Sequence, residues 1–368
     1  MSAPGSAPDR PPDGPAAAGG HGPARLGIVV VNYGSSALLA RNLAALDREA
    51  LPGSVVVVVD SRSTDAERAA VRALADRHGW LTETPDANIG FGAGVNLGVR
   101  AAIAAGCTAF LLLNPDVTID AAAVAALLAA AEARPATVVS PRLTRPDGSL
   151  WFAGARLDRR TGLTRYRPDG PPDGPDRWLS GACLLVTRAC WDLVGPFDER
   201  YFLYWEDVEW SQRALARGGD LLVLDDVTAV HAVGGTQRPD GMSTTYCRYM
   251  CRNRLRFAAD HVPPADRLRW LALAPRYARR ILLSDGRAAL LRRPQLALAA
   301  ARGTAAGAWA VLGSLAADGA ARLAARVARP FPRARSGRPP SSGGPVRRRR
   351  PSSASGRPRS ADRSPAGR

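Results

Sequence analysis

Two adjacent carboxylates in an aromatic-rich segment are the residues of this sequence best suited to acid–base chemistry. Glu206 and Asp207 lie within FDERYFLYWEDVEW, residues 197–210, where interleaved aromatic rings could form a sugar-stacking platform and desolvate a carboxyl group. A carboxylate whose pKa is raised in this way suits a general base that acts on a hydroxyl group. The same pair at a helix start would also complement the helix dipole, so the pattern alone leaves both interpretations open.

A second group of polar residues follows an apolar run. LLLNPDV, residues 111–117, places Asn114 and Asp116 two positions apart. An acid here could bind a hard cation that bridges diphosphate oxygens, or it could simply cap a turn. His231 follows another apolar run and precedes a Gly pair, which would suit a third metal ligand, although a lone His is usually structural.

Two further segments could contact a nucleotide. Asp60 ends a run of five valines, where its carboxylate could accept hydrogen bonds from a nucleobase or a ribose; an Asp at such a junction is also common in turns. NIGFGAGVN, residues 88–96, has small residues that let the backbone approach a phosphate or another helix closely. It matches neither a Walker loop nor a Rossmann fingerprint.

The elements that would position these residues alternate between strands and helices. Residues 27–32, 55–60 and 109–114 are short apolar runs with polar ends, typical of buried strands, and residues 65–78 are typical of a helix that Thr64 or Ser63 could cap. This alternation predicts an α/β fold with a parallel sheet and helices on both faces. Because ligands gather at the carboxyl ends of such strands, Asn32, Asp60, Asn114 and Asp116 are expected to converge on one edge.

Later segments have a different character. Residues 140–176 carry repeated PDG turn signals and predict a hairpin with a loop, residues 180–187 predict a strand, and residues 205–217 predict a helix. Residues 268–283 and 288–302 predict helices with a basic face. The apolar stretch 305–317 is shorter than a bilayer span and suits either an interfacial helix or a helix packed on the preceding domain.

Charge is distributed unevenly along the 368 residues, whose net charge is +17. Residues 26–251 are mildly acidic, whereas residues 252–329 hold 15 Arg against 4 acids and residues 330–368 hold 11 Arg against one. The predicted organisation is a disordered segment at 1–24, a catalytic domain at 25–260, a helical and possibly membrane-associating region at 261–329, and a disordered tail at 330–368. No secretory signal and no transmembrane helix are expected.

Seven segments in order resemble glycosyltransferase family 2, and specifically its rhamnosyltransferase-like branch. They are VVVNY (29–33), VVVDSRSTD (57–65), NIGFGAGVN (88–96), LLLNPD (111–116), SGACLLVTR (180–188), FDERYFLYWEDVEWSQR (197–213) and HAVGG (231–235). The resemblance covers about 230 residues. It implies a GT-A-type, Rossmann-like fold with a mixed, mostly parallel sheet and a C-terminal helical appendage.

The resemblance also implies an inverting transfer from a nucleoside-diphosphate sugar. Asp60 would read the nucleoside, Asp116 would hold Mg²⁺ or Mn²⁺ with His231 close by, and Asp207 would be the general base; Glu206 is the other candidate base. The remaining contacts to the nucleotide sugar are expected at Asn32, Tyr33, Asn88, Gly90, Gly94, Asn96, Asn114, Gly181 and Arg213. Arg213 could instead hold its helix in place.

The resemblance favours dTDP-rhamnose as the donor, with galactofuranose, glucose or mannose donors as alternatives. The acceptor would be a saccharide or a polyprenyl-linked glycan in cell-envelope polysaccharide synthesis. Ser61-Arg62 replaces the usual Asn-Ala, and Asn114 replaces the first Asp of the metal motif, so a non-catalytic sugar-nucleotide-binding protein is a further alternative. No specific nucleic-acid partner is expected, because the ordered body is acidic. We expect a cytoplasmic protein that is peripheral on the inner face of the membrane.

Overall fold

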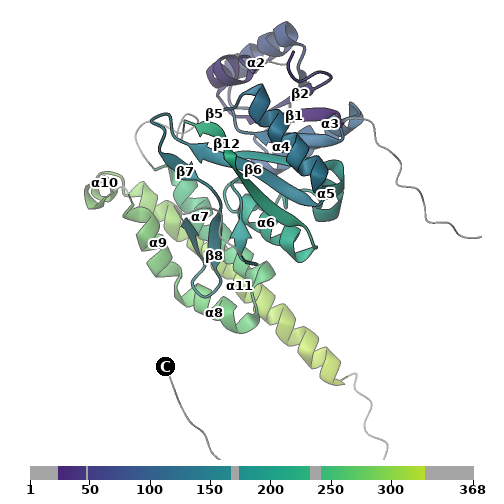
Figure 1. Ribbon diagram of the computed structural model, residues 1–368. Helices are drawn as coiled ribbons and strands as arrows, with labels where there is room; N and C mark the ends of the chain where they lie inside the picture. Colours follow the sequence, from purple (N-terminus) through teal and green to yellow (C-terminus); the bar gives the residue numbers. More distant parts are fainter. Residues whose placement is uncertain (1–23, 47–48, 167–173, 233–241, 285, 328–368) are drawn as a thin grey trace, which may run out of the picture. The chain divides into compact units, whose positions relative to one another are not determined.

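The central element of the fold is a nine-stranded sheet (Figure 1). The computed structural model describes residues 24–46, 49–166, 174–232, 242–284 and 286–327. The strands follow the order β3-β2-β1-β4-β11-β6-β12-β5, and β7 pairs with β6. Their bounds are β1 (Leu26–Asn32), β2 (Val55–Asp60), β3 (Leu81–Glu83), β4 (Ala109–Leu113), β5 (Val117–Thr118), β6 (Thr137–Thr144), β7 (Leu150–Phe152), β11 (Cys183–Thr187) and β12 (Asp220–His231).

The sheet is mixed and mostly parallel, which confirms the predicted α/β fold class. β1 pairs in parallel with β2 and β4, and β6 pairs in parallel with β12, whereas β11 runs antiparallel between β4 and β6. Every residue of β4 and β11 is buried. Strands covered on both faces are apolar along their whole length, and this is why the valine and leucine runs predicted them.

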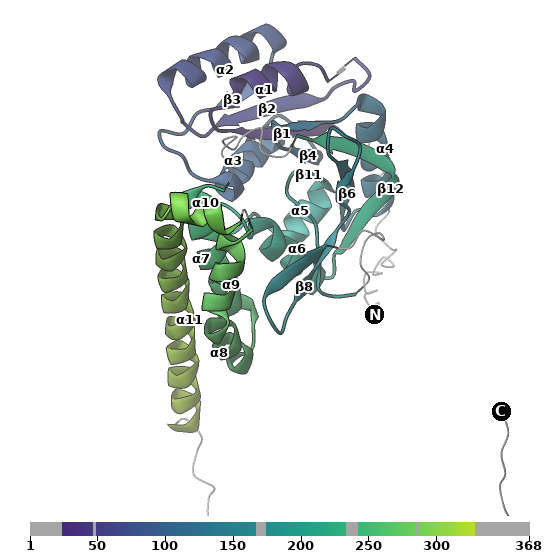
Figure 2. The same cartoon turned by 90° about the vertical axis from the view of Figure 1, so that its left-hand side faces the viewer.

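Helices cover both faces of this sheet, with α3 and α4 on opposite sides (Figure 2). Helix α2 (Asp65–His78) has the expected bounds: the Thr64 side chain accepts from Glu67 N, and Gly79 ends the helix at φ 66°. The leucine-rich stretch after β1 forms only a short α1 (Ser36–Leu38) and a π-helical turn (Leu39–Leu43). The other helices of this part are α3 (Phe91–Ala104), α4 (Ala121–Ala133), α5 (Arg188–Val194) and α6 (Glu206–Ala216).

A smaller sheet supplies one wall of the candidate site. It consists of β8 (Ala155–Asp158), β9 (Leu163–Tyr166) and β10 (Arg177–Trp178), with β8 between the other two. The hairpin predicted within residues 140–176 is confirmed, and the first PDG forms a turn with Gly148 at φ 81°. The PDG at 168–170 lies outside the described residues.

Five helices follow β12. Some of their residues extend the hydrophobic core of the sheet, and others, such as Tyr277, Ile281 and Leu296, form a second buried cluster. They are α7 (Thr244–His261), α8 (Pro264–Ala272), α9 (Ala274–Leu282), α10 (Arg287–Arg292) and α11 (Gln295–Val327). Phe257, Trp270 and Val311 belong to the same buried cluster as the sheet residues. The predicted division at residue 260 falls at the end of α7 and stays a prediction, and all but Ala24 of the segments predicted to be disordered lies outside the described residues.

The apolar stretch 305–317 is part of a longer helix than the sequence suggested. α11 continues on both sides of it, because Ala and Leu extend the helical run from Gln295. Residues Gln295–Arg322 are long and apolar enough to cross a membrane, with 33% of the most apolar window buried. A buried helix of a folded domain passes the same test, so length and composition alone do not assign α11 to a membrane.

Candidate active site

The polar residues that end β1, β2 and β4 lie at one edge of the sheet, as their parallel pairing requires. Asn32 is paired with Asp60 across β1 and β2, and its Nδ2 donates to Asp60 Oδ1 at 3.1 Å. Asn114 follows β4 and, together with Asp116, lines a cavity of about 250 Å³. The four residues predicted to converge therefore form two groups: Asn32 with Asp60, which bond to each other, and Asn114 with Asp116, which line the cavity.

The Asp60 side chain is enclosed by protein groups. It is 0% exposed, Oδ1 accepts from Asn32, and Oδ2 accepts from Arg68 Nε at 3.1 Å. Arg68 also donates to the Pro85 carbonyl at 2.6 Å, which fixes its guanidinium over the carboxylate. The expectation that Asn32 and Asp60 present their side chains to a nucleoside is not met by this arrangement, whereas Tyr33 beside them is 53% exposed. Sequence reasoning did not single out Arg68; its place on the helix after Asp60 was the available signal.

The glycine-rich segment packs helix α3 instead of forming an open phosphate cradle. A Cβ at Gly94 would stand 2.8 Å from the Val31 side chain, so the small residue allows α3 to approach β1. Asn96 is 2% exposed; its Oδ1 accepts from Phe197 N at 2.8 Å, and its Nδ2 donates to the Phe197 carbonyl at 2.9 Å. Gly94 and Asn96 thus have packing and hydrogen-bonding roles in this structure, and their contact with a nucleotide stays a prediction.

The start of α3 is arranged in the same way. Asn88 Oδ1 accepts from Gly90 N at 2.9 Å, and Gly90 has φ 85° with its Cα against the Phe202 carbonyl. Any side chain at residue 90 would collide with that carbonyl. Asn88 and Gly90 therefore join α3 to the segment before α6, and neither lines the cavity.

The cavity collects the remaining predicted residues. Asn114, Asp116, Gly181, Glu206, Asp207 and His231 all line it, although they come from distant parts of the chain. His231 Nε2 lies 3.2 Å from Asp116 Oδ1, and the Trp151 ring stands edge-on to the imidazole with centroids 4.2 Å apart. Phe91, Trp178 and Tyr204 add aromatic surface to the same wall. This combination suits a ligand that has both a ring and a charged group.

Asp207 and Glu206 differ in their hydrogen bonds, and this difference affects the pKa of each carboxyl group. Asp207 Oδ2 accepts from Gly181 N at 3.2 Å and Oδ1 accepts from Val208 N at 2.8 Å. Burial raises the pKa of Asp207 to about 6, and these backbone donors limit the rise. Burial and the neighbouring Asp207 charge raise the pKa of Glu206 well above its ordinary value, and its Oε2 has no partner in the described structure. Near neutral pH, Asp207 is therefore the ionised member of the pair.

Strained backbone precedes this pair. Tyr204 and Trp205 adopt φ values of 67° and 72°, the only non-glycine residues with positive φ in the described chain. Asn253 on α7 holds this turn, because its Nδ2 donates to the carbonyls of Leu203 at 2.9 Å and Tyr204 at 2.8 Å. Such strain persists only where surrounding contacts impose it. Sequence reasoning missed Asn253, which stands between Arg252 and Arg254 and so looks like one more polar residue of the helix.

We expect Asn253→Asp, which keeps the side-chain size but loses both N–H donors, to lower kcat by about tenfold, since small misplacements of catalytic groups are costly. It should also destabilise the fold by about 1–3 kcal/mol, because two carbonyls lose their donor. Steady-state kinetics and chemical denaturation measure both effects. Val124→Ala, at a buried position of α4 that does not line the cavity, is a control that destabilises the core without moving Asp207. Equal kcat loss in both variants would contradict a positioning role for Asn253.

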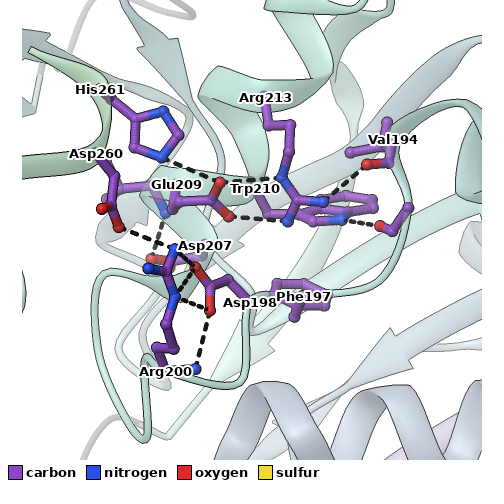
Figure 3. A network of polar contacts seen from close by, with 12 residues as sticks. Val194, Phe197, Asp198, Arg200, Asp207, Glu209, Trp210, Arg213, Asp260 and His261 are labelled. Atoms are coloured by element: carbon purple, nitrogen blue, oxygen red, sulfur yellow. Dashed lines mark hydrogen bonds and ion pairs between the residues drawn. The ribbon is translucent and has the colours of Figure 1, made fainter. Parts of the chain in front are cut away.

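Arg213 lies outside the cavity and fastens α6 (Figure 3). It donates to both carboxylate oxygens of Glu209, at 3.0 and 2.9 Å, and to the Val194 carbonyl at 2.8 Å. His261 approaches the same carboxylate at 3.3 Å. Burial would raise the pKa of Glu209, but its bonds to His261 and Arg213 hold it below the ordinary value. Arg213 was expected either to face a diphosphate or to hold its helix in place. These contacts support the second role.

Asp116 and His231, the residues predicted to bind a metal, could supply part of the coordination of a divalent cation. Asp116 is 3% exposed and its Oδ1 lies 3.2 Å from His231 Nε2 without forming a hydrogen bond to it, and His231 Nδ1 has no hydrogen-bond partner in the described structure. The carboxylate oxygen suits Mg²⁺ or Mn²⁺, whereas an imidazole nitrogen is a more usual ligand of softer divalent cations. No group of three or more His, Cys, Asp or Glu side chains gathers around them within the described residues. A cation held here would therefore take its other ligands from a substrate or water.

The sequence matches the model of the family described as "Glycosyl transferase family 2" over residues 27–188. One relative, an N-acetylglucosaminyl-diphospho-decaprenol L-rhamnosyltransferase from Mycobacterium tuberculosis, is 33% identical over 226 residues, covering 54% of this chain and 72% of the relative. A dTDP-rhamnosyl transferase, RfbF from Shigella flexneri, is 24% identical over 209 residues and covers 56% of this chain and 68% of its own length.

A solved structure is also similar. It is a mannosyltransferase from Pyrobaculum calidifontis in complex with GDP-Man and Mn²⁺, 20% identical in sequence. The match covers 82% of this chain and 81% of that one, with a TM-score of 0.47.

Proposed function

This chain belongs to glycosyltransferase family 2 and is an enzyme of sugar transfer, and from that premise we propose that it transfers rhamnose from dTDP-rhamnose to a lipid-linked saccharide, with inversion at the anomeric carbon. The names of the two bacterial relatives support rhamnose as the sugar, and the name of the mycobacterial one supports a polyprenyl-linked acceptor. The pathway would be cell-envelope polysaccharide synthesis.

The observation that carries the proposal is that Asp207, Asp116 and His231 line one aromatic cavity. Asp207 stands on one element, and Asp116 with His231 on two others, yet all line the same space. A glycosyl transfer needs a base for the acceptor hydroxyl and a positive charge for the departing diphosphate. The aromatic wall, which includes Trp151 and Tyr204, would orient the sugar ring between them.

In the proposed reaction, Asp207 accepts the proton of the acceptor hydroxyl as that oxygen attacks the anomeric carbon. The new C–O bond forms while the bond from the anomeric carbon to the diphosphate oxygen breaks, and nucleoside diphosphate leaves. The N–H groups of Gly181 and Val208 keep the Asp207 carboxylate oriented toward the cavity. Burial and the neighbouring Asp207 charge raise the pKa of Glu206 well above its ordinary value, and in its protonated form Glu206 could donate a hydrogen bond to a substrate hydroxyl.

Asp116 and His231 would hold Mn²⁺ or Mg²⁺. When bound, the cation would neutralise negative charge on the diphosphate. Asn114, which also lines the cavity, would offer a neutral amide where a second acid is commoner. The protein ligands would then carry a single negative charge, so we infer that the donor diphosphate contributes much of the affinity for the cation.

The proposed setting is the inner face of the cytoplasmic membrane, with the catalytic domain in the cytoplasm. α11 exposes Trp309 by 79% and Leu312 by 50%, and α9 carries Arg276, Arg279 and Arg280. Exposed apolar side chains beside arginines are suited to a surface of anionic lipid.

A thermal-shift panel tests the donor. With Mn²⁺ present, dTDP-rhamnose at about 100-fold above its Kd should raise Tm by about 5 °C or more, since saturation at that level stabilises by about 2.7 kcal/mol. UDP-galactofuranose, UDP-glucose and GDP-mannose should shift Tm less, and dTDP alone and rhamnose alone are the controls. A larger shift with another donor would overturn rhamnose but leave the transferase. Binding without any turnover on a lipid-linked acceptor would favour a non-catalytic sugar-nucleotide-binding protein.

A further inference from the structure

A second pocket, of about 330 Å³, lies outside the active cavity and is strongly basic. Its lining includes four arginines, Arg165, Arg254, Arg276 and Arg280, and no acidic residue. Clustered arginines without acids repel one another, so such an arrangement is unfavourable unless an anion is bound there. The active-site residues described above do not contribute to this pocket.

Arg254 forms the rigid floor of the pocket. Its side chain is 1% exposed and donates to the backbone carbonyls of Thr161 at 2.6 Å, Gly162 at 3.2 Å and Trp270 at 3.1 Å. The guanidinium also lies 5.0 Å from the Trp270 ring centroid and 4.8 Å from that of Tyr277. Burial lowers the pKa of Arg254 to about 10, so it remains charged at neutral pH. No carboxylate is paired with it in the described structure.

Arg276 and Arg280 form the rim. They are four residues apart on α9, which puts them on one face of the helix, and both are exposed. Neither makes an ion pair within the described residues. Arg165 differs, because Asp158 pairs with it at 3.1 Å. The pocket thus has three arginines whose charge no acid balances.

The basic pocket and the active cavity share a wall. Along β9, Thr164 and Tyr166 line the active cavity, whereas Leu163 and Arg165 line the basic pocket, as the alternation of a strand predicts. On α7, Met250 faces the cavity and Arg254 faces the pocket. A ligand in the basic pocket would therefore lie directly behind the strand that bounds the active site.

We propose that this pocket binds a phosphoryl anion, such as a phosphate or diphosphate group, at a site distinct from that of the sugar donor. Planar guanidinium groups match phosphate oxygens through paired hydrogen bonds, and an immobilised one binds with little loss of side-chain freedom. A phosphoryl group carried by a lipid and a free phosphate would present the same kind of oxygens to these arginines.

Calorimetric titration of the full chain with inorganic pyrophosphate, in EDTA to remove divalent cations, tests the proposal. The double variant Arg276→Gln/Arg280→Gln should bind pyrophosphate about tenfold or more weakly, because each replacement removes charge-assisted hydrogen bonds. Arg292→Gln/Arg302→Gln removes the same charge at exposed positions outside the pocket and should bind as the native chain does. Equal weakening in both variants, or no measurable binding by the native chain, would overturn the site.

Flotation with vesicles distinguishes the two sources of the phosphoryl group. Vesicles that contain phosphatidic acid, compared with vesicles of phosphatidylcholine alone, report a lipid-borne group. Loss of phosphatidic-acid binding only in Arg276→Gln/Arg280→Gln would identify a lipid headgroup; unchanged vesicle binding with weakened pyrophosphate binding would identify a free phosphate. Neither readout requires sugar transfer, so failure of this site and failure of the proposed transferase activity are separately visible.

Discussion

Replacing Asp207 with asparagine should lower kcat by about 10²–10⁴-fold, the contribution typical of a positioned general base. The amide has nearly the same shape and keeps an oxygen that can accept from Gly181 N, but it cannot take up the acceptor proton. Donor affinity, measured by calorimetry, should change little, because the change concerns the proton transfer. A loss confined to kcat is what distinguishes a base from a binding residue.

Glu206→Gln is the matched control for this prediction. Glu206 is adjacent and lines the same cavity, and because its pKa is raised well above the ordinary value, a neutral amide resembles the form that burial favours. We expect this variant to keep most of the activity. If Glu206→Gln abolished turnover and Asp207→Asn did not, the two roles would be exchanged.

The pH dependence of the native enzyme follows from the same geometry. Because the pKa of Asp207 is raised to about 6, the fraction of ionised base increases as pH rises through 6. The kcat/KM profile should therefore fall on the acid side with an apparent pKa near 6, and this limb should be absent from the residual activity of Asp207→Asn. An acid limb near pH 4 would argue that Asp207 is not desolvated in solution.

Replacing Asp116 with asparagine should lower kcat/KM by about 10²-fold or more, since charge stabilisation by a bound cation contributes several kcal/mol. The Asp116 carboxylate is buried beside His231 and has an oxygen without a donor, so a neutral amide would remove the one negative charge of the pair. The readout independent of activity is the thermal shift caused by Mn²⁺, which should disappear in this variant.

Asp120→Asn provides the control for Asp116→Asn. Asp120 caps α4, its Oδ1 accepts from Ala123 N at 2.7 Å, and it lies outside the cavity. Asparagine caps helices about as well, so this variant loses the same charge nearby without structural cost. An Mn²⁺ shift that survives in Asp116→Asn, or is lost equally in Asp120→Asn, would place the cation elsewhere.

Local sequence patterns determined much of the fold. The valine run 55–59, the Thr64 cap and the Gly79 stop mark β2 and α2 because burial, capping and positive φ each depend on a few neighbouring residues. The sequence also identified the residues of the active cavity, since Asp116, Asp207 and His231 each follow or begin an element at the same end of the sheet. Because these residues are spread between positions 116 and 231, the sequence did not show how close together their side chains lie in the folded protein.

Tertiary structure decided which polar residues are free to act. Asp60, Asn96 and Arg213 have side chains suited to ligand binding, yet Arg68, Phe197 and Glu209 occupy them. The choice between Glu206 and Asp207 also depended on residues from outside their helix, because Gly181 is 26 positions away and donates to only one of them. A one-dimensional pattern shows which side chain can make a hydrogen bond, but only the folded chain supplies the partner that satisfies it or leaves it unsatisfied.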